Sequence, residues 1–350
     1  MTIATPLIED RTYLRHFWHP VCTVAELAQS GEDGAGPLAA TLLDEDIVIA
    51  RLDGKIAALA DRCAHRFAKL SLGKVTGGNI QCPYHGWQYD GTGMCRRMPA
   101  APDMKLPKKP LVESYDCREK YDLVWVRLDS SWDCTEIPHC SAWENPDFKK
   151  IIVAEPYEWK SSSERRWENF TDFSHFAYVH PGTLFDPAYD EVEIVPMDRV
   201  DGEFRFALAP GRDMLDRLPP DSPLGSFTYR AGMPYTVDLM ISLYRDNTPF
   251  LLWTTSSPTT AETCRNFMII AHVNGDQPDS DALDFQKIVL DEDQPVIESQ
   301  PGILSVEEAS LPTDKISREY RKWHKELSVA ATAGRDAFEK ALLTNIVESG

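Results

Sequence analysis

Short apolar segments separated by turn-forming residues dominate the first part of the chain. Residues 47–51 and 56–60 are two such segments, and they are joined through Asp53-Gly54. An Asp-Gly pair between two apolar segments is typical of a β-hairpin with a two-residue turn. Residues 123–128 form a further apolar run, Leu-Val-Trp-Val-Arg-Leu, that is typical of a buried strand. The pattern therefore predicts an antiparallel β domain in this part of the chain.

The second half of the chain has a different organisation. Residues 134–147 contain two prolines and resemble a loop, so we place a domain boundary there. We expect one domain at residues 1–140 and a second at 141–350. Five short apolar segments in the second domain predict one antiparallel sheet: residues 204–209, 227–230, 237–244, 250–255 and 266–273.

Helical periodicity is strongest near the C-terminus. Residues 282–293 contain no helix-breaking residue before Pro295, and Gln286, Leu290 and Asp293 would share one face of that helix. From residue 313 an apolar stripe at helical spacing predicts an amphipathic helix, formed by Ile316, Tyr320, Trp323 and Leu327. A last helix is expected to carry Phe338, Leu342 and Ile346.

Composition narrows the class of protein. The 350 residues are 43% hydrophobic and 26% charged, as in ordinary globular proteins of about two domains. The formal net charge of −19 repels nucleic acids and anionic membranes, so we expect neither as a partner. No apolar run approaches the roughly 18 residues of a membrane span, and the first residues lack the apolar core of a secretory leader. We therefore expect a cytoplasmic protein with reduced cysteines, in which clustered cysteines bind metal.

One pair of short motifs carries the clearest chemical signal. Cys63-Ala-His65 is followed sixteen residues later by Cys82-Pro-Tyr-His85. Two thiolates and two imidazoles from two loops suit a [2Fe–2S] cluster in which two His replace two Cys on one iron. A structural zinc site is the alternative, but zinc fingers usually place both Cys in one knuckle and both His in the other. The motif therefore predicts a Rieske-type cluster. Phe67 stands where we would expect a smaller residue.

A second group of candidate ligands lies in residues 166–180. On a helix, Asn169, Asp172 and His175 would share one face, because they are spaced three residues apart. The Pro-Gly pair after this segment would end the helix and free His180 to turn back toward His175. Two imidazoles and a carboxylate from elsewhere would form the facial triad of a non-haem Fe(II) oxygenase. The alternative is an aromatic core helix with two hydrogen-bonded histidines.

Together these two motifs resemble those of Rieske non-haem iron oxygenases. Residues 13–22, 165–175 and 180–187 are similar to bacterial methylxanthine N-demethylases, and the likeness covers nearly the whole chain. The resemblance implies an α+β protein with an N-terminal all-β Rieske domain. It also implies a C-terminal helix-grip domain, in which a curved antiparallel sheet wraps around a long helix.

The resemblance implies further site residues. It assigns the iron carboxylate to Asp293, for which Asp291 and Glu292 are the rivals on the same helix. It also implies a ring-shaped homotrimer, or a hexamer of mixed trimers with a related subunit. Asp172 would then connect His175 to the cluster ligand His85 of a neighbouring subunit, with Asn169 behind the iron.

Electrons must come from a partner protein. No glycine fingerprint for a nucleotide precedes a helix in this sequence. By resemblance, the partner is an NADH-oxidising reductase that carries flavin and an iron–sulfur centre, and dioxygen is the co-substrate. A ferredoxin-type electron carrier is an alternative function, but it would not need the second group of ligands.

The resemblance also implies a small methylated purine as substrate. A flat, neutral ring needs apolar walls and one or two polar groups for orientation. Phe170 and Leu290 would supply walls, and the amide of Gln286 would donate to the ring. We expect removal of the N3-methyl group of theobromine as formaldehyde, which leaves 7-methylxanthine. The alternative is an O-demethylase of an aromatic carboxylate such as vanillate, for which a cation such as Arg230 or Arg245 would have to reach the pocket.

Overall fold

The computed structural model describes residues 5–31, 33–184, 191–208, 224–243, 249–273 and 278–347. Contacts divide the chain into two compact units. One unit comprises residues Leu14–Ile137, and the other comprises Met1–Tyr13 together with Pro138–Gly350. No helix among these residues has the length and apolar character that crossing a bilayer demands.

The unit Leu14–Ile137 consists of two antiparallel sheets. Its larger sheet has the strand order β1-β10-β9-β4-β3-β2, with β1 (His19–Thr23), β2 (Leu38–Leu42), β3 (Glu45–Leu52), β4 (Lys55–Ala60), β9 (Ser114–Lys120) and β10 (Leu123–Arg127). The smaller sheet is β5-β6-β7-β8, with β5 (Lys74–Thr76), β6 (Asn79–Gln81), β7 (Gln88–Tyr89) and β8 (Cys95–Arg97). Short helices α1 (Val24–Ala28) and η2 (Leu70–Leu72) connect strands, and η1 (Thr12–His16) leads into the unit.

Two local predictions for this unit are confirmed. Leu52 on β3 pairs with Lys55 on β4, which leaves Asp53 and Gly54 as a two-residue turn. Their φ angles of 48° and 77° are the left-handed values that a type I′ hairpin turn requires. Every residue of β10 is buried, as its apolar sequence predicts, because β10 pairs with both β1 and β9.

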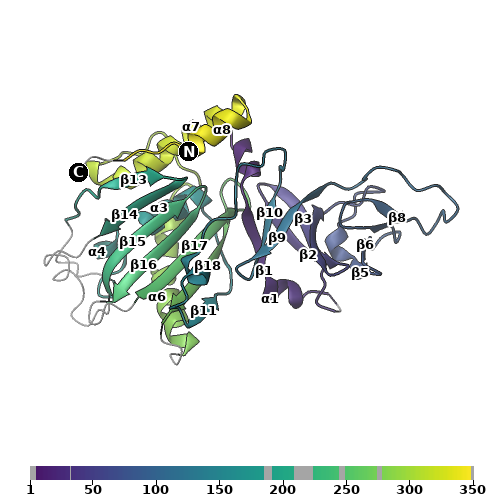
Figure 1. Ribbon diagram of the computed structural model, residues 1–350, viewed down its shortest axis with the longest axis horizontal. Helices are drawn as coiled ribbons and strands as arrows, with labels where there is room; N and C mark the ends of the chain where they lie inside the picture. The colour runs from purple at the N-terminus through teal and green to yellow at the C-terminus, as the bar shows by residue number, and fades with distance from the viewer. Residues whose placement is uncertain are drawn as a thin grey trace. The chain divides into compact units, whose positions relative to one another are not determined.

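The second unit is built on one large antiparallel sheet with the order β11-β18-β17-β16-β15-β14-β13 (Figure 1). Its strands are β11 (Lys150–Val153), β13 (Met197–Val200), β14 (Glu203–Leu208), β15 (Leu224–Gly232), β16 (Thr236–Leu243), β17 (Pro249–Pro258) and β18 (Cys264–His272), and the short β12 (Tyr157–Trp159) also pairs with β18. The five predicted segments fall on β14 to β18. The α+β class and the sheet-and-helix arrangement expected for this part of the chain are confirmed.

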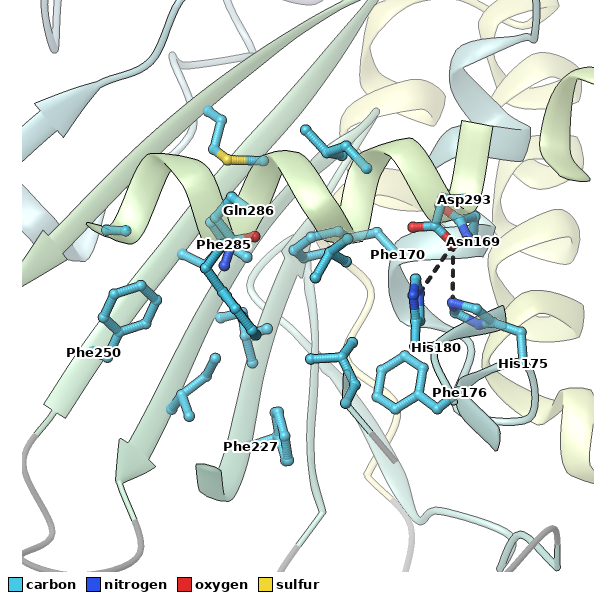
Figure 2. Close-up of a pocket in the computed structure, with 18 of the residues that line it drawn as sticks. Asn169, Phe170, His175, Phe176, His180, Phe227, Phe250, Phe285, Gln286 and Asp293 are labelled. Atoms are coloured by element: carbon cyan, nitrogen blue, oxygen red, sulfur yellow. Dashed lines mark hydrogen bonds and ion pairs between the residues drawn. The ribbon is translucent and has the colours of Figure 1, made fainter. Parts of the chain in front are cut away.

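Helices complete this unit. They are α2 (Ser141–Glu144), α3 (Ser163–Thr171), α4 (Phe176–Val179), α6 (Asp279–Glu298), η3 (Pro312–Asp314), α7 (Lys315–Thr332) and α8 (Arg335–Leu343). The long helix α6 crosses one face of the sheet, and Figure 2 shows strands passing behind it. The stripe Ile316, Tyr320, Trp323 and Leu327 is buried along α7, as predicted.

Three helix predictions need correction. The helix α6 does not stop at Pro295 but continues to Glu298. Proline removes one amide donor, and the carbonyl that loses its partner belongs to Asp291, an exposed residue that water can reach. Ile346 lies beyond the end of α8 and instead forms an isolated β-bridge with Arg199. The third correction concerns the ligand segment after Thr171, which is not one continuous helix.

Candidate active site and cluster site

The two loops with the cluster motif have the same backbone hydrogen bonds. The N–H of Cys63 donates to the carbonyl of Ala68, and the Cys63 carbonyl accepts from the N–H of Phe67. Likewise, the N–H of Cys82 donates to Trp87, and the Cys82 carbonyl accepts from Gly86. Each cysteine therefore stands at the base of a tight loop, with its histidine two or three residues further on.

These loops bring the four candidate cluster ligands together. The rings of His65 and His85 lie 4.5 Å apart between centroids. Cys63 and Cys82 are both 1% exposed and belong to one apolar core, and burial raises the pKa of the Cys82 thiol. Tyr89 Oη lies 3.3 Å from the sulfur of Cys63, as a group that could hydrogen-bond a cluster sulfur. Two buried sulfurs and two more exposed imidazoles fit a cluster held between protein and solvent.

The candidate iron ligands are His175 and His180, which flank the two ends of α4, and Asp293 on α6; the preceding helix α3 leads into them. Ser162 caps α3, because its hydroxyl accepts the N–H of Arg165 at 3.2 Å. The helix ends at Thr171, since the Asp172 carboxylate accepts the N–H of Ser174 at 2.8 Å and takes an extended backbone. Asn169, Asp172 and His175 therefore do not lie on one helix, and the prediction of a shared helical face is wrong.

Three ligand atoms nevertheless converge. His175, His180 and Asp293 each present one ligand atom, and these atoms lie within 4.8 Å of one another. The Nε2 atoms of His175 and His180 are 3.4 Å and 3.2 Å from the same oxygen, Oδ1 of Asp293 (Figure 2). Two imidazoles and one carboxylate that converge in this way suit a ferrous ion that keeps open positions.

A carboxylate stands behind each imidazole. Asp172 Oδ2 lies 3.3 Å from Nδ1 of His175, and Glu292 Oε2 lies 2.7 Å from Nδ1 of His180. Glu292 also accepts the hydroxyl of Thr183 at 2.8 Å. An acceptor at Nδ1 leaves Nε2 as the atom that faces the metal. Among the rival carboxylates, Asp291 is exposed and pairs with Lys287.

The charges of this group are strongly coupled. Burial alone would lower the pKa of His175, but the carboxylates of Asp172 and Asp293 outweigh it and raise that pKa to about 9. Burial would raise the pKa of Asp293, yet its contacts with His175 and His180 hold that pKa well below its usual value. His175 therefore forms ion pairs with Asp172 and Asp293 in the metal-free protein, and a bound cation would displace the proton of His175.

Two further residues hold the carboxylate ligand in place. Asn169 donates from Nδ2 to Oδ1 of Asp293 at 3.0 Å, and its own Oδ1 accepts from Arg166 at 3.0 Å. The guanidinium of Arg166 is buried, with its Cζ 4.7 Å from the ring of Trp159 and 5.1 Å from that of Phe170. Sequence reasoning missed Arg166, although its spacing of three residues from Asn169 on a helix was a usable signal.

A cavity of about 320 Å³ opens beside these ligands. Figure 2 shows it extending from His175 and His180 along α6 to Gln286, with Phe170 between the two ends. Gln286, Leu290 and Phe170, the predicted substrate contacts, all line it. Sequence reasoning missed most of its aromatic walls, which are Phe176, Phe227, Tyr229, Phe250 and Phe285, because strands that are distant in sequence supply several of them.

Charged groups are scarce in this cavity. Arg166 is the one Arg or Lys among the described residues that line it, and Asn169 and Tyr157 already accept from its two terminal nitrogens. Arg230 instead forms an ion pair with Glu203 at 2.9 Å and does not line the cavity. Arg245 lies outside the described residues. The described walls therefore suit a flat, neutral, largely apolar molecule.

Comparison with known proteins identifies two matching domain families and two full-length relatives of the chain. Residues 17–116 match the Rieske [2Fe-2S] domain, and residues 159–330 match the vanillate O-demethylase oxygenase C-terminal domain. Methylxanthine N3-demethylase NdmB of Pseudomonas putida is 55% identical over 348 residues, which are 98% of each chain. Methylxanthine N1-demethylase NdmA of the same organism is 50% identical over 342 residues, 97% of each chain.

Solved structures agree with these matches. The structure of Pseudomonas putida NdmA with caffeine covers 97% of this chain and 98% of its own, with a TM-score of 0.92 and 50% identity. The structure of NdmB covers 99% of this chain and 100% of its own, with a TM-score of 0.90 and 54% identity.

Proposed function

The chain belongs to the Rieske non-haem iron oxygenases, and from that premise we propose that it removes an N-methyl group from a methylxanthine. The preferred substrate in this proposal is theobromine, and the preferred position is its N3-methyl group. The reaction consumes one dioxygen, two electrons and two protons. It yields water, formaldehyde and the purine with a free N–H, here 7-methylxanthine.

One observation carries the proposal. The side chain of Gln286 is buried, at 7% exposure, and faces the cavity. Its amide forms no hydrogen bond with any other residue of the described chain. An amide that a bound ligand cuts off from water costs about 1–3 kcal/mol if it stays without a partner, so the site favours a ligand that offers a ring carbonyl or nitrogen at this point. A neutral methylated purine offers both kinds of acceptor.

The metal site is the second part of the proposal. His175, His180 and Asp293 would hold a ferrous ion, and the convergence of their donor atoms supports this. When bound, iron there would activate dioxygen for hydroxylation of the methyl carbon, and the resulting hydroxymethyl group leaves as formaldehyde. Asn169 would keep Asp293 in position, and Asp172 and Glu292 would keep each Nε2 turned toward the ion.

The position of the methyl group follows from the spacing along α6. Gln286 and Asp293 are seven residues apart, which is about 10 Å along a helix axis. A purine that accepts a hydrogen bond from Gln286 therefore extends one edge toward the iron ligands. Leu290 lies between the two residues and fills the space beside the ring. We propose that this combination turns the N3-methyl group toward the metal, and the 55% identity to an N3-demethylase supports that choice.

Electron supply completes the proposal. Cys63, His65, Cys82 and His85 would hold the [2Fe–2S] cluster, for which the paired loops give suitable donors. A separate flavin and iron–sulfur reductase would deliver electrons from NADH. Asp172 would carry these electrons from the cluster of a neighbouring subunit to the iron site. The subunits would form a homotrimer, or a hexamer of mixed trimers with a related chain.

The test is substrate choice. The purified protein, with a reductase and NADH, is incubated separately with caffeine, theobromine, theophylline and vanillate, and formaldehyde and the demethylated product are quantified. We expect theobromine to give one formaldehyde and 7-methylxanthine. Turnover of vanillate and of none of the purines would replace the proposal with an aryl-ether O-demethylase.

Two variants on one helix sharpen the test. Gln286→Ala removes the unpaired amide, so we expect the preference among methylxanthines to fall roughly tenfold to a hundredfold while iron content is kept. Gln294→Ala is the matched control, because Gln294 stands on the same helix, pairs with Glu298 and does not line the cavity. Equal effects of the two substitutions would contradict the role of Gln286.

A further inference from the structure

One hydroxyl group in the apolar cavity has no role in the function proposed above. Tyr229 lines the cavity beside the candidate iron ligands, and its phenol forms no hydrogen bond with any residue of the described chain. Tyr229 as a whole is only 1% exposed, yet its oxygen is not among the fully enclosed side-chain atoms that lack a partner. The little surface that Tyr229 keeps therefore includes its hydroxyl, which opens into the cavity.

The alternation of strand β15 turns this side chain toward the cavity. Phe227 and Tyr229 both line the cavity, and the register pairs Tyr229 with Leu239, which lines it as well. Thr228, between the first two residues, is exposed on the opposite face of the sheet. Tyr229 thus belongs to the sheet side of the cavity, whereas Gln286 belongs to α6, which crosses that face (Figure 2).

Packing holds the ring of Tyr229 in one position. The ring stacks on Phe206, with centroids 4.7 Å apart and planes at 12°, and Phe173 meets it edge to face at 5.5 Å. Neither Phe206 nor Phe173 lines the cavity. A ring held on two sides cannot turn to follow a ligand, so its hydroxyl offers a fixed polar point, as a group that orients a ligand requires.

A chain of rings connects Tyr229 with the candidate iron ligands. Phe173 lies 5.9 Å from Phe176, and Phe176 lies 4.9 Å from His175, measured between ring centroids. Figure 2 shows Phe176 beside the candidate histidines and Gln286 at the other end of the cavity. Tyr229 and Gln286 therefore offer two polar groups at different depths of the space that a substrate would fill.

The hydroxyl of Tyr229 is a hydrogen-bond donor at ordinary pH. Burial raises the pKa of Tyr229 far above its usual value of about 10, and the negative charge of Asp172 raises it further. The phenol therefore stays protonated and is able to donate to a ring carbonyl or a ring nitrogen. A ligand that covers this hydroxyl without accepting its hydrogen bond would bind less well than one that accepts it.

We propose that Tyr229 is a specificity-determining residue that donates a hydrogen bond to an acceptor beside the methyl-bearing nitrogen of the substrate. This inference rests on the proposed function. When the N3-methyl group of theobromine faces the candidate iron ligands, the acceptors next to it are the C2 carbonyl oxygen and N9. The C6 carbonyl then lies at the opposite edge, within the part of the cavity where Gln286 stands. Two fixed donors at opposite edges admit one orientation of the ring, which selects the methyl group that faces the metal.

The first test removes the hydroxyl alone. Tyr229→Phe keeps the ring and its stacking, so we expect the melting temperature and iron content to be kept while kcat/KM for theobromine falls roughly three- to tenfold. Thr228→Val is the matched control, because it removes a hydroxyl from the neighbouring residue on the opposite face of the sheet. This control should keep the wild-type kcat/KM. Equal losses in the two variants would overturn the proposal.

Substrate analogues distinguish a hydrogen bond from a structural effect. 9-Deazatheobromine lacks the N9 acceptor, and 2-thiotheobromine carries a weakly accepting sulfur in place of the C2 oxygen. We expect one of the two to lose, with the wild type, about the factor that Tyr229→Phe loses with theobromine. The same analogue should lose nothing further with Tyr229→Phe, which would identify the acceptor. If the losses of both analogues are as large in the variant as in the wild type, Tyr229 contacts neither acceptor and the proposal is wrong.

Caffeine gives a second readout, because its N-methyl groups compete for the same site. We expect the wild type to remove the N3-methyl group, and Tyr229→Phe to release a larger share of N1- or N7-demethylated product. An unchanged product ratio would contradict the orienting role. If the wild type demethylates theobromine and Tyr229→Phe matches it throughout, the role of Tyr229 alone is refuted. If the wild type demethylates no purine, the proposed function is refuted and this inference with it.

Discussion

At the residue scale, the candidate iron site is organised by the carboxylates behind its histidines. Asp172 and Glu292 face the Nδ1 atoms of His175 and His180, so that both Nε2 atoms point at Asp293. Asn169 and Arg166 extend the same arrangement behind Asp293. The geometry of the three ligands therefore depends on residues that would not touch the metal.

The role of Glu292 is testable by metal binding. Glu292→Ala removes the acceptor at Nδ1 of His180, so we expect ferrous iron affinity to fall roughly 10- to 100-fold. Asp291→Ala is the control, because Asp291 is the preceding residue and pairs only with the exposed Lys287. Titration of metal-free protein with Fe(II) or Co(II) gives both affinities. Similar losses in the two variants would contradict a specific role for Glu292.

The raised pKa of His175 predicts how the metal-free protein responds to pH. Its folded-state pKa of about 9 exceeds its ordinary value of about 6.5. Its stabilising contribution is therefore fully present below pH 6.5 and is lost as pH rises through 9. By linkage, this contribution to the free energy of unfolding is about 3 kcal/mol. The lowered pKa of Asp293 arises from the same ion pairs, so it adds no further contribution.

Melting temperatures between pH 6.5 and 9.5 check this prediction. We expect the metal-free protein to lose stability over that range. Metal competes with the proton on His175, so the advantage of Co(II)-loaded over metal-free protein should grow with pH. His175→Gln should remove most of the pH dependence of the metal-free protein. If the melting temperatures of the metal-free and Co(II)-loaded forms changed in parallel with pH, metal binding would not be coupled to the proton on His175.

Metal ligands could be predicted from the sequence where they lie close together along the chain. They could not be predicted from spacing where they lie far apart. The pairs Cys63-His65 and Cys82-His85 are separated by so few residues that the chain itself brings each pair together. Asp293 is over a hundred residues from His180, so only family resemblance could single it out from Asp291 and Glu292. The role of Glu292 behind His180 depends on which face of α6 meets α4. Only the structure shows that face.

At the scale of elements, the break between α3 and α4 is what allows the ligands to meet. A continuous helix would carry His175 and His180 to different sides. Asp172 ends α3 by accepting the N–H of Ser174, and its other oxygen faces His175. One aspartate thus ends the helix and orients a candidate ligand. Helical spacing alone predicts an unbroken helix, because the pattern does not reveal a side chain that bonds its own backbone.

The start of α3 gives a stability prediction. Ser162→Ala removes the cap hydrogen bond to Arg165 and should cost about 1 kcal/mol, within a range of roughly 0.5–2 kcal/mol. Ser161→Ala is the control, since the buried hydroxyl of Ser161 has no hydrogen-bond partner among the described residues. Its removal should be neutral or slightly stabilising. Calorimetric unfolding of both variants measures the difference, and equal destabilisation would contradict the cap.

The strands and α6 were easier to predict than the helix breaks. Apolar segments marked β14 to β18, because these strands bury apolar side chains in one sheet. Burial alternates along β14, whereas nearly every residue of β17 and β18 is buried. Pro295 misled the prediction for α6, since a proline near a helix end can be tolerated where the affected carbonyl faces water. The aromatic cavity walls come from several strands and two helices, and no local pattern contains that information.

At the scale of the whole molecule, the candidate cluster ligands and the candidate iron ligands lie in different compact units. The unit Leu14–Ile137 contains both ligand loops in residues 61–109, whose nine Lys or Arg and three Asp give a formal net charge of +6. The other unit has a second, more polar cavity of about 540 Å³, lined by Asp172, His175 and Asp293 among others. The candidate iron ligands therefore lie between an apolar cavity suited to substrate and a polar one on the side of Asp172.

Electron transfer through Asp172 is the prediction that concerns the assembled enzyme. Asp172→Asn keeps an oxygen acceptor for the imidazole of His175 but removes the charge. Because Asp172 would connect His175 to the cluster of a neighbouring subunit, we expect a variant loaded with both metals to reduce its cluster normally. Reoxidation of that cluster by substrate and dioxygen should slow by roughly 10- to 100-fold or more.

Stopped-flow absorbance of the pre-reduced protein measures that step directly. Asp314→Asn is the matched control, because it removes a second carboxylate from the wall of the same polar cavity without touching a candidate iron ligand. Because Asp172 lies behind the candidate ligand His175, its substitution could also weaken iron binding. Metal analysis of each sample therefore distinguishes slow electron transfer from loss of iron. Normal reoxidation in Asp172→Asn with full iron content would exclude this carboxylate as the connection. Slow reoxidation in both variants would instead indicate that the overall charge of the cavity, and not the contact with His175, controls the rate.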